Sequence, residues 1–244
     1  MLEVVTIAGR APTLVFLHEG LGCVAMWRDV PALLAARTGC AALVYSRAGY
    51  GRSHAVSLPR PLDYMEGDGV AELSGVLAGI DDAVLIGHSD GGTIALAYAA
   101  SHGGLRGVIV EAAHVFCEDA SIRSIEAARA AFVQGDLRRR LAAYHGDNVD
   151  CAFWGWNDAW LHPDFRRWNI EASLPRIAVP VLALQGRQDA YGTPAQLEAI
   201  ARGVARAEVR LLDDCGHTPH REQPQITLDA MVAFVAGLPR PPTV

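Results

Sequence analysis

The feature that most constrains this chain is an alternation of short apolar runs with longer helical patterns. Five of the runs are almost continuously hydrophobic, which is typical of strands whose two faces are both covered by helices. A sixth, Ala207–Leu212, alternates more and is expected at the edge of the sheet, and Leu2–Ile7 is expected to add one or two edge strands. The five buried runs are Thr13–His18, Ala41–Ser46, Ala83–Gly87, Gly107–Glu111 and Pro180–Gln185.

Helical patterns separate these runs, and the alternation predicts an α/β fold. We expect a mostly parallel central sheet with helices on both faces and right-handed crossovers. A length of 244 residues is compatible with one domain of this kind. The expected helices are Trp27–Thr38, Gly67–Ala78, Gly91–His102, Pro194–Arg202 and Gln223–Ala236.

One stretch, from about Val115 to Ile177, interrupts the alternation because it has no strand pattern. Helices are expected over Ile122–Val133 and Leu137–Tyr144, and an aromatic segment follows that contains three of the five tryptophans. We predict that 115–177 is a helical cap over a pocket and that 1–114 and 178–244 form the core. The aromatic rings either contact substrate or attach the cap to the core. The substrate-binding candidates among them are Trp154, Trp156 and Trp160.

Composition excludes several functional classes. The net charge is −6, all 21 basic side chains are arginine, and the only basic cluster is Arg138–Arg140, so nucleic-acid binding is not expected. No stretch approaches the roughly 18 apolar residues of a membrane span. The five cysteines include no C-x-x-C pair and the N-terminus lacks a secretory pattern, so we expect a cytoplasmic protein.

Known cofactor and metal motifs are also missing from the sequence. There is no H-E-x-x-H motif, no G-x-x-x-x-G-K-[ST] loop and no lysine at all. Gly20 and Gly22 are not followed by the third glycine of a dinucleotide fingerprint. We therefore expect neither a metal nor a cofactor.

The strand pattern Ala83–Gly87 leads into Gly87-His88-Ser89-Asp90-Gly91, a G-x-S-x-G motif followed by a helical pattern. Small residues on both sides of the serine allow a tight strand-to-helix turn that exposes its hydroxyl at the carboxyl edge of the sheet. The same turn aims the helix N-terminus and the backbone N–H of Asp90 at that hydroxyl. Ser89 is therefore the candidate nucleophile.

A nucleophilic serine needs a base, and the base needs an acid to orient it. Asp189 and His217 each follow a strand pattern, so both are expected at the same sheet edge as Ser89. The order Ser89, Asp189, His217 is the order of one α/β architecture. The alternatives left open are His220 as the base and Glu111, at the end of an earlier strand, as the acid.

These motifs, in this order, resemble the α/β-hydrolase family from about Val5 to Phe234. His18–Gly22 (HEGLG) resembles the family's oxyanion loop, and Tyr45–Ser53 resembles its D-x-R-G-x-G-x-S loop, with Ser46 near the usual Asp. Gly87–Gly92 resembles the nucleophile elbow, Gly186–Asp189 the acid loop, and Gly216-His217 the histidine loop.

The resemblance implies a role for each matching residue. Ser89 would attack a carbonyl carbon, His217 would accept its proton and later activate water, and Asp189 would orient His217. Backbone N–H groups of Gly20 and Asp90 would hold the oxyanion, each contributing about 3–4 kcal/mol.

Three polar side chains beside this machinery have open roles. Glu19 is a candidate substrate-binding residue that stands where the family usually has glycine, and we expect its carboxyl either in a buried hydrogen-bond network or protonated. His114 follows a strand and is a candidate substrate contact. The side chain of Asp90 either binds a substrate ammonium group or bonds to a neighbouring loop, and we favour the local bond.

The expected activity is hydrolysis of a small carboxylic ester through an acyl-serine intermediate. Lactone, thioester and carbon–carbon bond hydrolysis use the same triad, and a non-catalytic ligand-binding protein is a further alternative. The expected partner is a small-molecule substrate, and the sequence does not define an oligomeric state.

Overall fold

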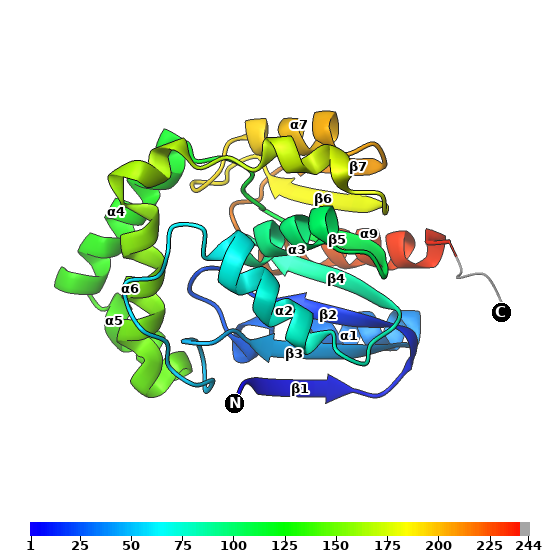
Figure 1. Ribbon diagram of the computed structural model, residues 1–244, viewed down its shortest axis with the longest axis horizontal. Coiled ribbons are helices and arrows are strands. Elements are labelled where there is room, and N and C mark those ends of the chain that lie inside the picture. Colours follow the sequence, from blue (N-terminus) through cyan, green and yellow to red (C-terminus); the bar gives the residue numbers. More distant parts are fainter. Residues whose placement is uncertain (240–244) are drawn as a thin grey trace.

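A seven-stranded sheet organises the computed structural model, which describes residues 1–239 (Figure 1). The strand order is β1-β3-β2-β4-β5-β6-β7, and every neighbouring pair is parallel except β1 with β3. This confirms the six predicted strands and the edge position of Ala207–Leu212, and the N-terminal residues add one antiparallel edge strand. The strands are β1 (Glu3–Ile7), β2 (Arg10–Leu17), β3 (Cys40–Ser46), β4 (Ala83–His88), β5 (Leu105–Glu111), β6 (Val181–Gly186) and β7 (Ala207–Leu212).

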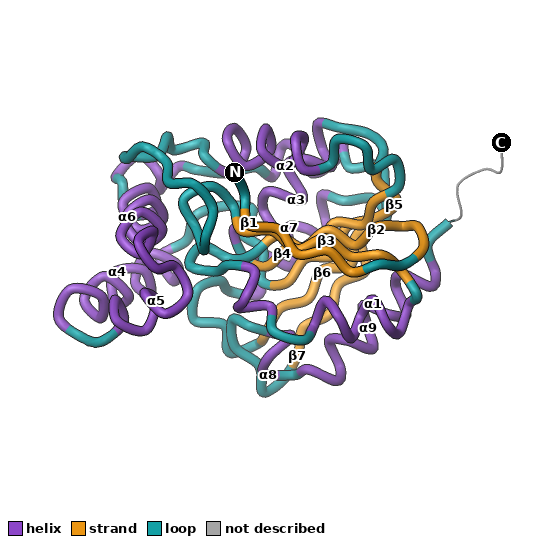
Figure 2. The backbone as a smooth tube through the Cα atoms, turned by 90° about the horizontal axis from the view of Figure 1, so that it is seen from below, coloured by secondary structure: helices purple, strands orange, loops and turns teal. Residues whose placement is uncertain are grey.

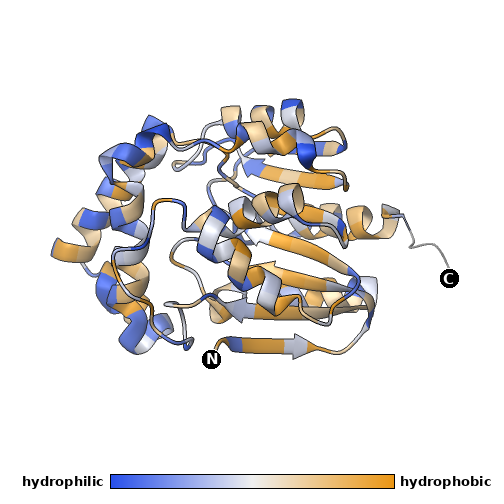
Figure 3. Cartoon of the chain, in the orientation of Figure 1, coloured by the Kyte–Doolittle hydropathy of each residue, from blue (hydrophilic) through white to orange (hydrophobic). Residues whose placement is uncertain are grey.

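Helices cover both faces of the sheet, as predicted (Figure 2). One face packs against α2 (Val70–Val76), α3 (Asp90–Ser101) and α7 (Pro194–Gly203), and the other against α1 (Val30–Thr38) and α9 (Pro224–Gly237). Successive residues of a strand point to opposite faces, so the hydrophobic strands supply both cores, and hydrophobic residues accordingly line the central strands (Figure 3).

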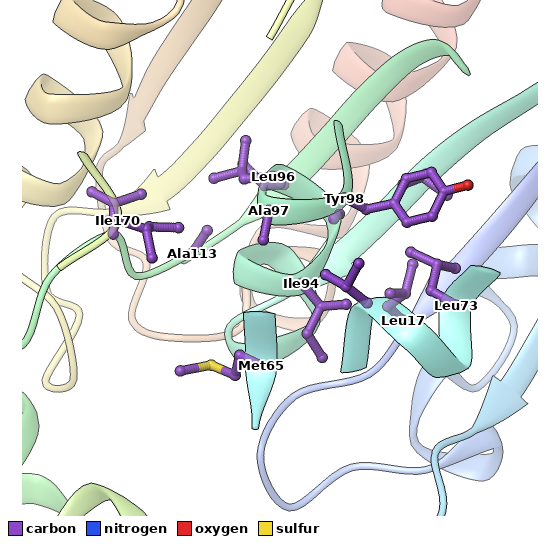
Figure 4. Packing of buried hydrophobic residues seen from close by; sticks show 14 of the residues in the cluster. Leu17, Met65, Leu73, Ile94, Leu96, Ala97, Tyr98, Ala113 and Ile170 are labelled. Carbon is purple, nitrogen blue, oxygen red and sulfur yellow. The ribbon is translucent and has the colours of Figure 1, made fainter. Parts of the chain in front are cut away.

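Three consecutive residues of β4 show how a strand supplies both cores. Leu85 belongs to the α2–α3 core, where Met65, Leu73 and Ile94 also pack (Figure 4). Its neighbours Val84 and Ile86 belong to the α1–α9 core on the other face.

Two predicted helices have different starts in the structure. The expected helix over Trp27–Thr38 is divided into a 3-10 turn, Val24–Trp27, and α1, because Arg28 between them has a positive φ of 52° and Pro31 lies in the first turn of α1. The expected helix over Gly67–Ala78 begins as a π-helical turn, Met65–Gly69, before α2. A short helix that was not predicted, α8 (Pro219–Glu222), precedes α9.

Most of the residues between β5 and β6 form a separate group of helices at one end of the sheet, at the left of Figure 1. This end is the carboxyl end of the parallel strands. Within the described chain the group contains no strand, only an isolated bridge between Phe116 and Asn169. Its helices are α4 (Asp119–Gln134), α5 (Leu137–His145) and α6 (Val149–Trp160), with 3-10 turns at Gly146–Asn148 and Pro163–Arg167. A further 3-10 turn, Glu171–Arg176, lies outside this group and packs against α3 and α7. The division into core and cap stays a prediction here.

Gly91, in the first turn of α3, sets how closely that helix approaches β2. A Cβ atom at this position would collide with the carbonyl oxygen of Leu17 and lie 2.7 Å from that of His18. Both obstacles are backbone, so Gly91→Ala should lower the free energy of unfolding by about 3 kcal/mol or more. Urea unfolding followed by circular dichroism measures this change.

Gly75 provides the matched control, because it is an exposed helical glycine whose added Cβ would meet nothing within 4 Å. Gly75→Ala should stabilise the protein by about 0.5–1 kcal/mol through helix propensity. Equal effects of the two substitutions would contradict the close approach of α3 to β2.

Candidate active site

Ser89 occupies the turn between β4 and α3. Its φ is +52°, a left-handed conformation that is strained for a residue with a side chain. Its backbone N–H donates to the carbonyl oxygen of Glu111 on β5 at 2.8 Å, which fixes the turn against the neighbouring strand. A Cβ at Gly87 would collide with the backbone of Gly91, so the glycines around the serine are needed for the turn to close.

Asp189 and His217 lie on the loops that follow β6 and β7, and the structure brings them together. Nδ1 of His217 lies 2.9 Å from both carboxylate oxygens of Asp189. Backbone N–H groups of Tyr191 and Gly192 donate to the same carboxylate at 2.8 and 3.3 Å. Burial alone would raise the pKa of Asp189, but these bonds and His217 hold it below its usual value, so the carboxylate is charged.

Ser89 and His217 line one cavity of about 230 Å³ at the carboxyl edge of the sheet. The described residues show no hydrogen bond between the serine hydroxyl and the Nε2 atom of His217. Bonds of this kind are often long in enzymes without substrate and tighten in the reacting complex.

The two rival residues, Glu111 and His220, pair with each other instead. The Glu111 carboxylate accepts hydrogen bonds from the backbone N–H of His220 at 2.8 Å and from its Nδ1 at 3.0 Å. Both side chains are buried. Burial would raise the pKa of Glu111, but His220 outweighs it and the net shift is downward. Neither residue hydrogen-bonds Asp189 or the ring of His217 within residues 1–239.

Gly20 and Asp90 line the cavity on the side of Ser89. Among the backbone hydrogen bonds of the loops and turns in residues 1–239, none is donated by the N–H of Gly20 or by the N–H of Asp90. The Trp156 ring packs so closely on Gly20 that a Cβ there would collide with it. The loop after β2 is thus shaped by a side chain from α6.

Glu19 also lines the cavity, and its carboxylate lies 3.5 Å from Nδ1 of His88. Burial would raise the pKa of Glu19, but His88 lowers it well below its usual range. The same pair raises the pKa of His88 to about 9, against the effect of burial. Of the two expectations for Glu19, the contact with His88 favours a charged carboxylate in a local network over a protonated one.

His88 contacts the histidine loop as well as Glu19. Its Nε2 lies 2.7 Å from the backbone oxygen of His217 and donates to it. The residue before the serine therefore connects the loops that carry Glu19 and His217.

The Asp90 side chain is buried in a local network, the arrangement that we favoured over an ammonium site. It accepts a short hydrogen bond from the Tyr64 hydroxyl and lies 4.0 Å from the Arg47 guanidinium. The Trp160 indole N–H donates to the same Tyr64 hydroxyl at 3.0 Å. Burial raises the pKa of Asp90, against the opposing charge of Arg47.

Trp156, Trp160 and His114 line the cavity that contains Ser89, whereas Trp154 is not among its lining residues. In α6, positions 156 and 160 are one helical turn apart and share a face, whereas position 154 points elsewhere. The Trp154 ring packs against Phe132 and Phe153, and the Arg129 guanidinium lies over it at 5.3 Å. It holds helices of the inserted group together.

Several other residues line the cavity that sequence reasoning did not identify. They come from four separate segments and carry no shared motif, so only the folded chain could group them. Ser121 could not be recognised because it lies in an ordinary amphipathic helix, and Arg221 because it follows the histidine loop in α8. The additional lining residues are Leu21, Met26, Ser121, Ile125, Tyr191, Thr218 and Arg221.

A search of residues 1–239 finds no group of three or more histidine, cysteine, aspartate or glutamate side chains that could hold a metal ion. The same part of the chain has no helix that is both long and apolar enough to cross a membrane.

Comparison with known proteins relates most of the chain to one family. The profile described as Alpha/beta hydrolase family matches residues 14–230. The Monoacylglycerol lipase ABHD6 of Bos taurus is 29% identical over 72 residues. That match covers 30% of this chain and spans only 21% of the relative's own length.

Solved structures share the fold at low sequence identity. An esterase from Exiguobacterium antarcticum superimposes with a TM-score of 0.74 and 19% identity, covering 97% of this chain and 96% of that one. The enol-lactonase from Burkholderia xenovorans gives a TM-score of 0.71 and 21% identity, covering 96% of both chains. At these identities the likeness establishes a common architecture.

Proposed function

Because the chain belongs to the α/β-hydrolase family, we propose that it is a serine hydrolase that cleaves a small carboxylic ester through an acyl-Ser89 intermediate. The observation that carries this proposal is the meeting of Ser89 with the Asp189–His217 pair in one cavity. Esterases are among its structural neighbours, and part of the chain is similar to a monoacylglycerol lipase.

The first half of the reaction is acylation. The hydroxyl oxygen of Ser89 attacks the ester carbonyl carbon while Nε2 of His217 accepts its proton. The charged Asp189 keeps the proton on Nδ1 and stabilises the imidazolium that forms. Collapse of the tetrahedral intermediate expels the alcohol, which takes the proton from Nε2.

The second half is deacylation. Nε2 of His217 removes a proton from water, the resulting hydroxide attacks the acyl-Ser89 carbonyl, and the acid product leaves as the serine is reprotonated. In both halves the oxyanion is held by the free N–H groups of Gly20 and Asp90. The charge of Glu19 opposes this oxyanion less than its position suggests, because His88 balances it.

The helices of residues 115–177 act as a cap in this proposal. Trp156 and Trp160 of α6 and Ile125 of α4 form an apolar wall facing Ser89. A small cavity with such a wall fits a short acyl or alcohol group.

Hydrolysis of p-nitrophenyl esters tests the proposal directly. We expect turnover of acetate to hexanoate esters, with kcat/KM falling for decanoate because the cavity holds only about 230 Å³. A fluorophosphonate should label Ser89, identified by peptide mass spectrometry. Labelling without turnover of any p-nitrophenyl ester would redirect the search to lactones and thioesters. A folded protein that is neither labelled nor active would refute the serine-hydrolase mechanism.

A further inference from the structure

His114 differs from the other buried histidines in having no hydrogen-bond partner for its ring within residues 1–239. His18 and His145 use both ring nitrogens: His18 bonds the Glu19 carbonyl and the Arg47 N–H, and His145 bonds the Gly51 N–H and the Leu21 carbonyl. His88 and His220 each bond through one nitrogen. A buried polar group without a partner costs about 1–3 kcal/mol, so its retention needs an explanation.

The position of the ring supplies one. His114 follows β5, is 3% exposed and lines the cavity that contains Ser89. Its ring centroid lies 5.9 Å from that of His217 and 5.1 Å from the Trp160 ring. A substrate atom in contact with His114 is therefore close to the scissile bond and not at the far end of a long acyl or alcohol group.

The ring is uncharged over the working range of pH. Burial, assisted by the neighbouring His217, lowers the pKa of His114 to about 3. A neutral imidazole carries one N–H donor and one bare nitrogen. Nδ1 is fully enclosed and unpartnered, and an enclosed bare acceptor is tolerated more often than an enclosed N–H. The proton is thus best placed on Nε2, which is left to bond a molecule in the cavity.

Several charged groups around the cavity are already engaged, whereas the side chains of Tyr191, Thr218 and the exposed Arg221, which also line it, make no hydrogen bond within residues 1–239. Glu19 pairs with His88, Asp90 with Tyr64 and Arg47, and His217 with Asp189. The nearby wall, formed by Ile125, Trp156 and Trp160, is apolar. A substrate that matches this lining has an apolar body and one acceptor oxygen, such as a hydroxyl, near the ester.

We propose that His114 determines specificity by donating a hydrogen bond from Nε2 to an acceptor oxygen of the substrate close to the scissile ester. This inference rests on the proposed ester hydrolysis and names the substrate class of that site. It makes His114 a binding residue with no part in proton transfer.

Two isosteric ester pairs test the proposal, one for each side of the ester. In the acyl pair, p-nitrophenyl 3-hydroxybutyrate is compared with p-nitrophenyl 3-methylbutyrate. In the alcohol pair, 2-hydroxyethyl butyrate is compared with propyl butyrate by pH-stat titration. The quantity measured is the ratio of kcat/KM for the hydroxylated ester to that for its apolar isostere, in wild type and in His114→Phe. Dividing the two ratios removes the intrinsic reactivity of the esters.

We expect the wild-type ratio to exceed the His114→Phe ratio about tenfold for at least one pair. His114→Gln, which keeps a donor, should recover part of the preference, and His162→Phe, at an exposed site, should change nothing. The melting temperature of His114→Phe should stay the same or rise, because an unpaired buried polar group is removed. A melting temperature that falls sharply would instead assign His114 a structural role.

The outcomes separate the two proposals. If His114→Phe hydrolyses the apolar esters and its kcat/KM ratio stays within twofold of the wild-type ratio for both pairs, the proposed role of His114 is overturned. The proposed function then still stands. Absence of turnover for all four esters, together with absence of phosphonate labelling at Ser89, overturns both.

Discussion

Ser89→Ala should lower kcat for ester hydrolysis about 10⁵- to 10⁶-fold while the protein stays folded. The substitution removes the atom that forms the acyl bond, and water attack guided by the remaining groups is far slower. Alanine fits the site because only a hydroxyl is lost from a side chain that makes no hydrogen bond within residues 1–239. The measurement is initial rates with p-nitrophenyl butyrate, accompanied by thermal unfolding.

Ser57→Ala is the control, since Ser57 is exposed and does not line the cavity. It should retain wild-type kcat and melting temperature. If Ser89→Ala kept more than about one hundredth of the wild-type rate, a nucleophile other than Ser89, or directly activated water, would have to replace the acyl-serine mechanism.

Asp189→Asn should lower kcat about 10⁴-fold. Asparagine has nearly the same shape, but its amide neither requires a proton on Nδ1 of His217 nor stabilises the imidazolium. The ring is then free to adopt the tautomer that cannot accept the serine proton. Steady-state kinetics at pH 8 measures the loss, and a shift of less than tenfold would show that Asp189 is not the acid of the triad.

Glu111→Gln is the matched test at the rival position. The Glu111 side chain is as buried as that of Asp189 and also binds a histidine, but its partner His220 does not line the Ser89 cavity. Removing one charge of this buried pair should cost several kcal/mol of stability. The folded variant should keep kcat within about tenfold. Exchange of the two results, with Glu111→Gln inactive and Asp189→Asn active, would move the acid to β5.

Much of the architecture could be predicted because local sequence and global fold agree. The runs that became β2, β4 and β5 are hydrophobic on both faces, and a parallel sheet covered by helices is the arrangement that buries both. Ser89 and Asp189 each follow such a run and His217 follows the edge strand β7, so the topology placed all three at one sheet edge.

The details that could not be predicted depend on contacts between distant segments. Whether Glu19 is charged is decided by His88, which is on another strand. Whether a tryptophan of 153–160 reaches the cavity depends on its helical phase, and that phase was unknown while the segment had no assigned structure. Which histidine pairs with Glu111 and which with Asp189 depends on where His220 and His217 fold, and the structure pairs Glu111 with His220 and Asp189 with His217.

The strands that flank the cap are direct neighbours in the sheet. Glu111 at the end of β5 pairs with Leu184 of β6, so the chain leaves the sheet and returns to the adjacent strand. The entropy of closing such an excursion grows only with the logarithm of its length. The segment inserted between β5 and β6 can therefore be lengthened, shortened or exchanged at small thermodynamic cost to the sheet. If residues 115–177 act as the proposed cap, substrate selection can change while the sheet that carries Ser89 stays fixed.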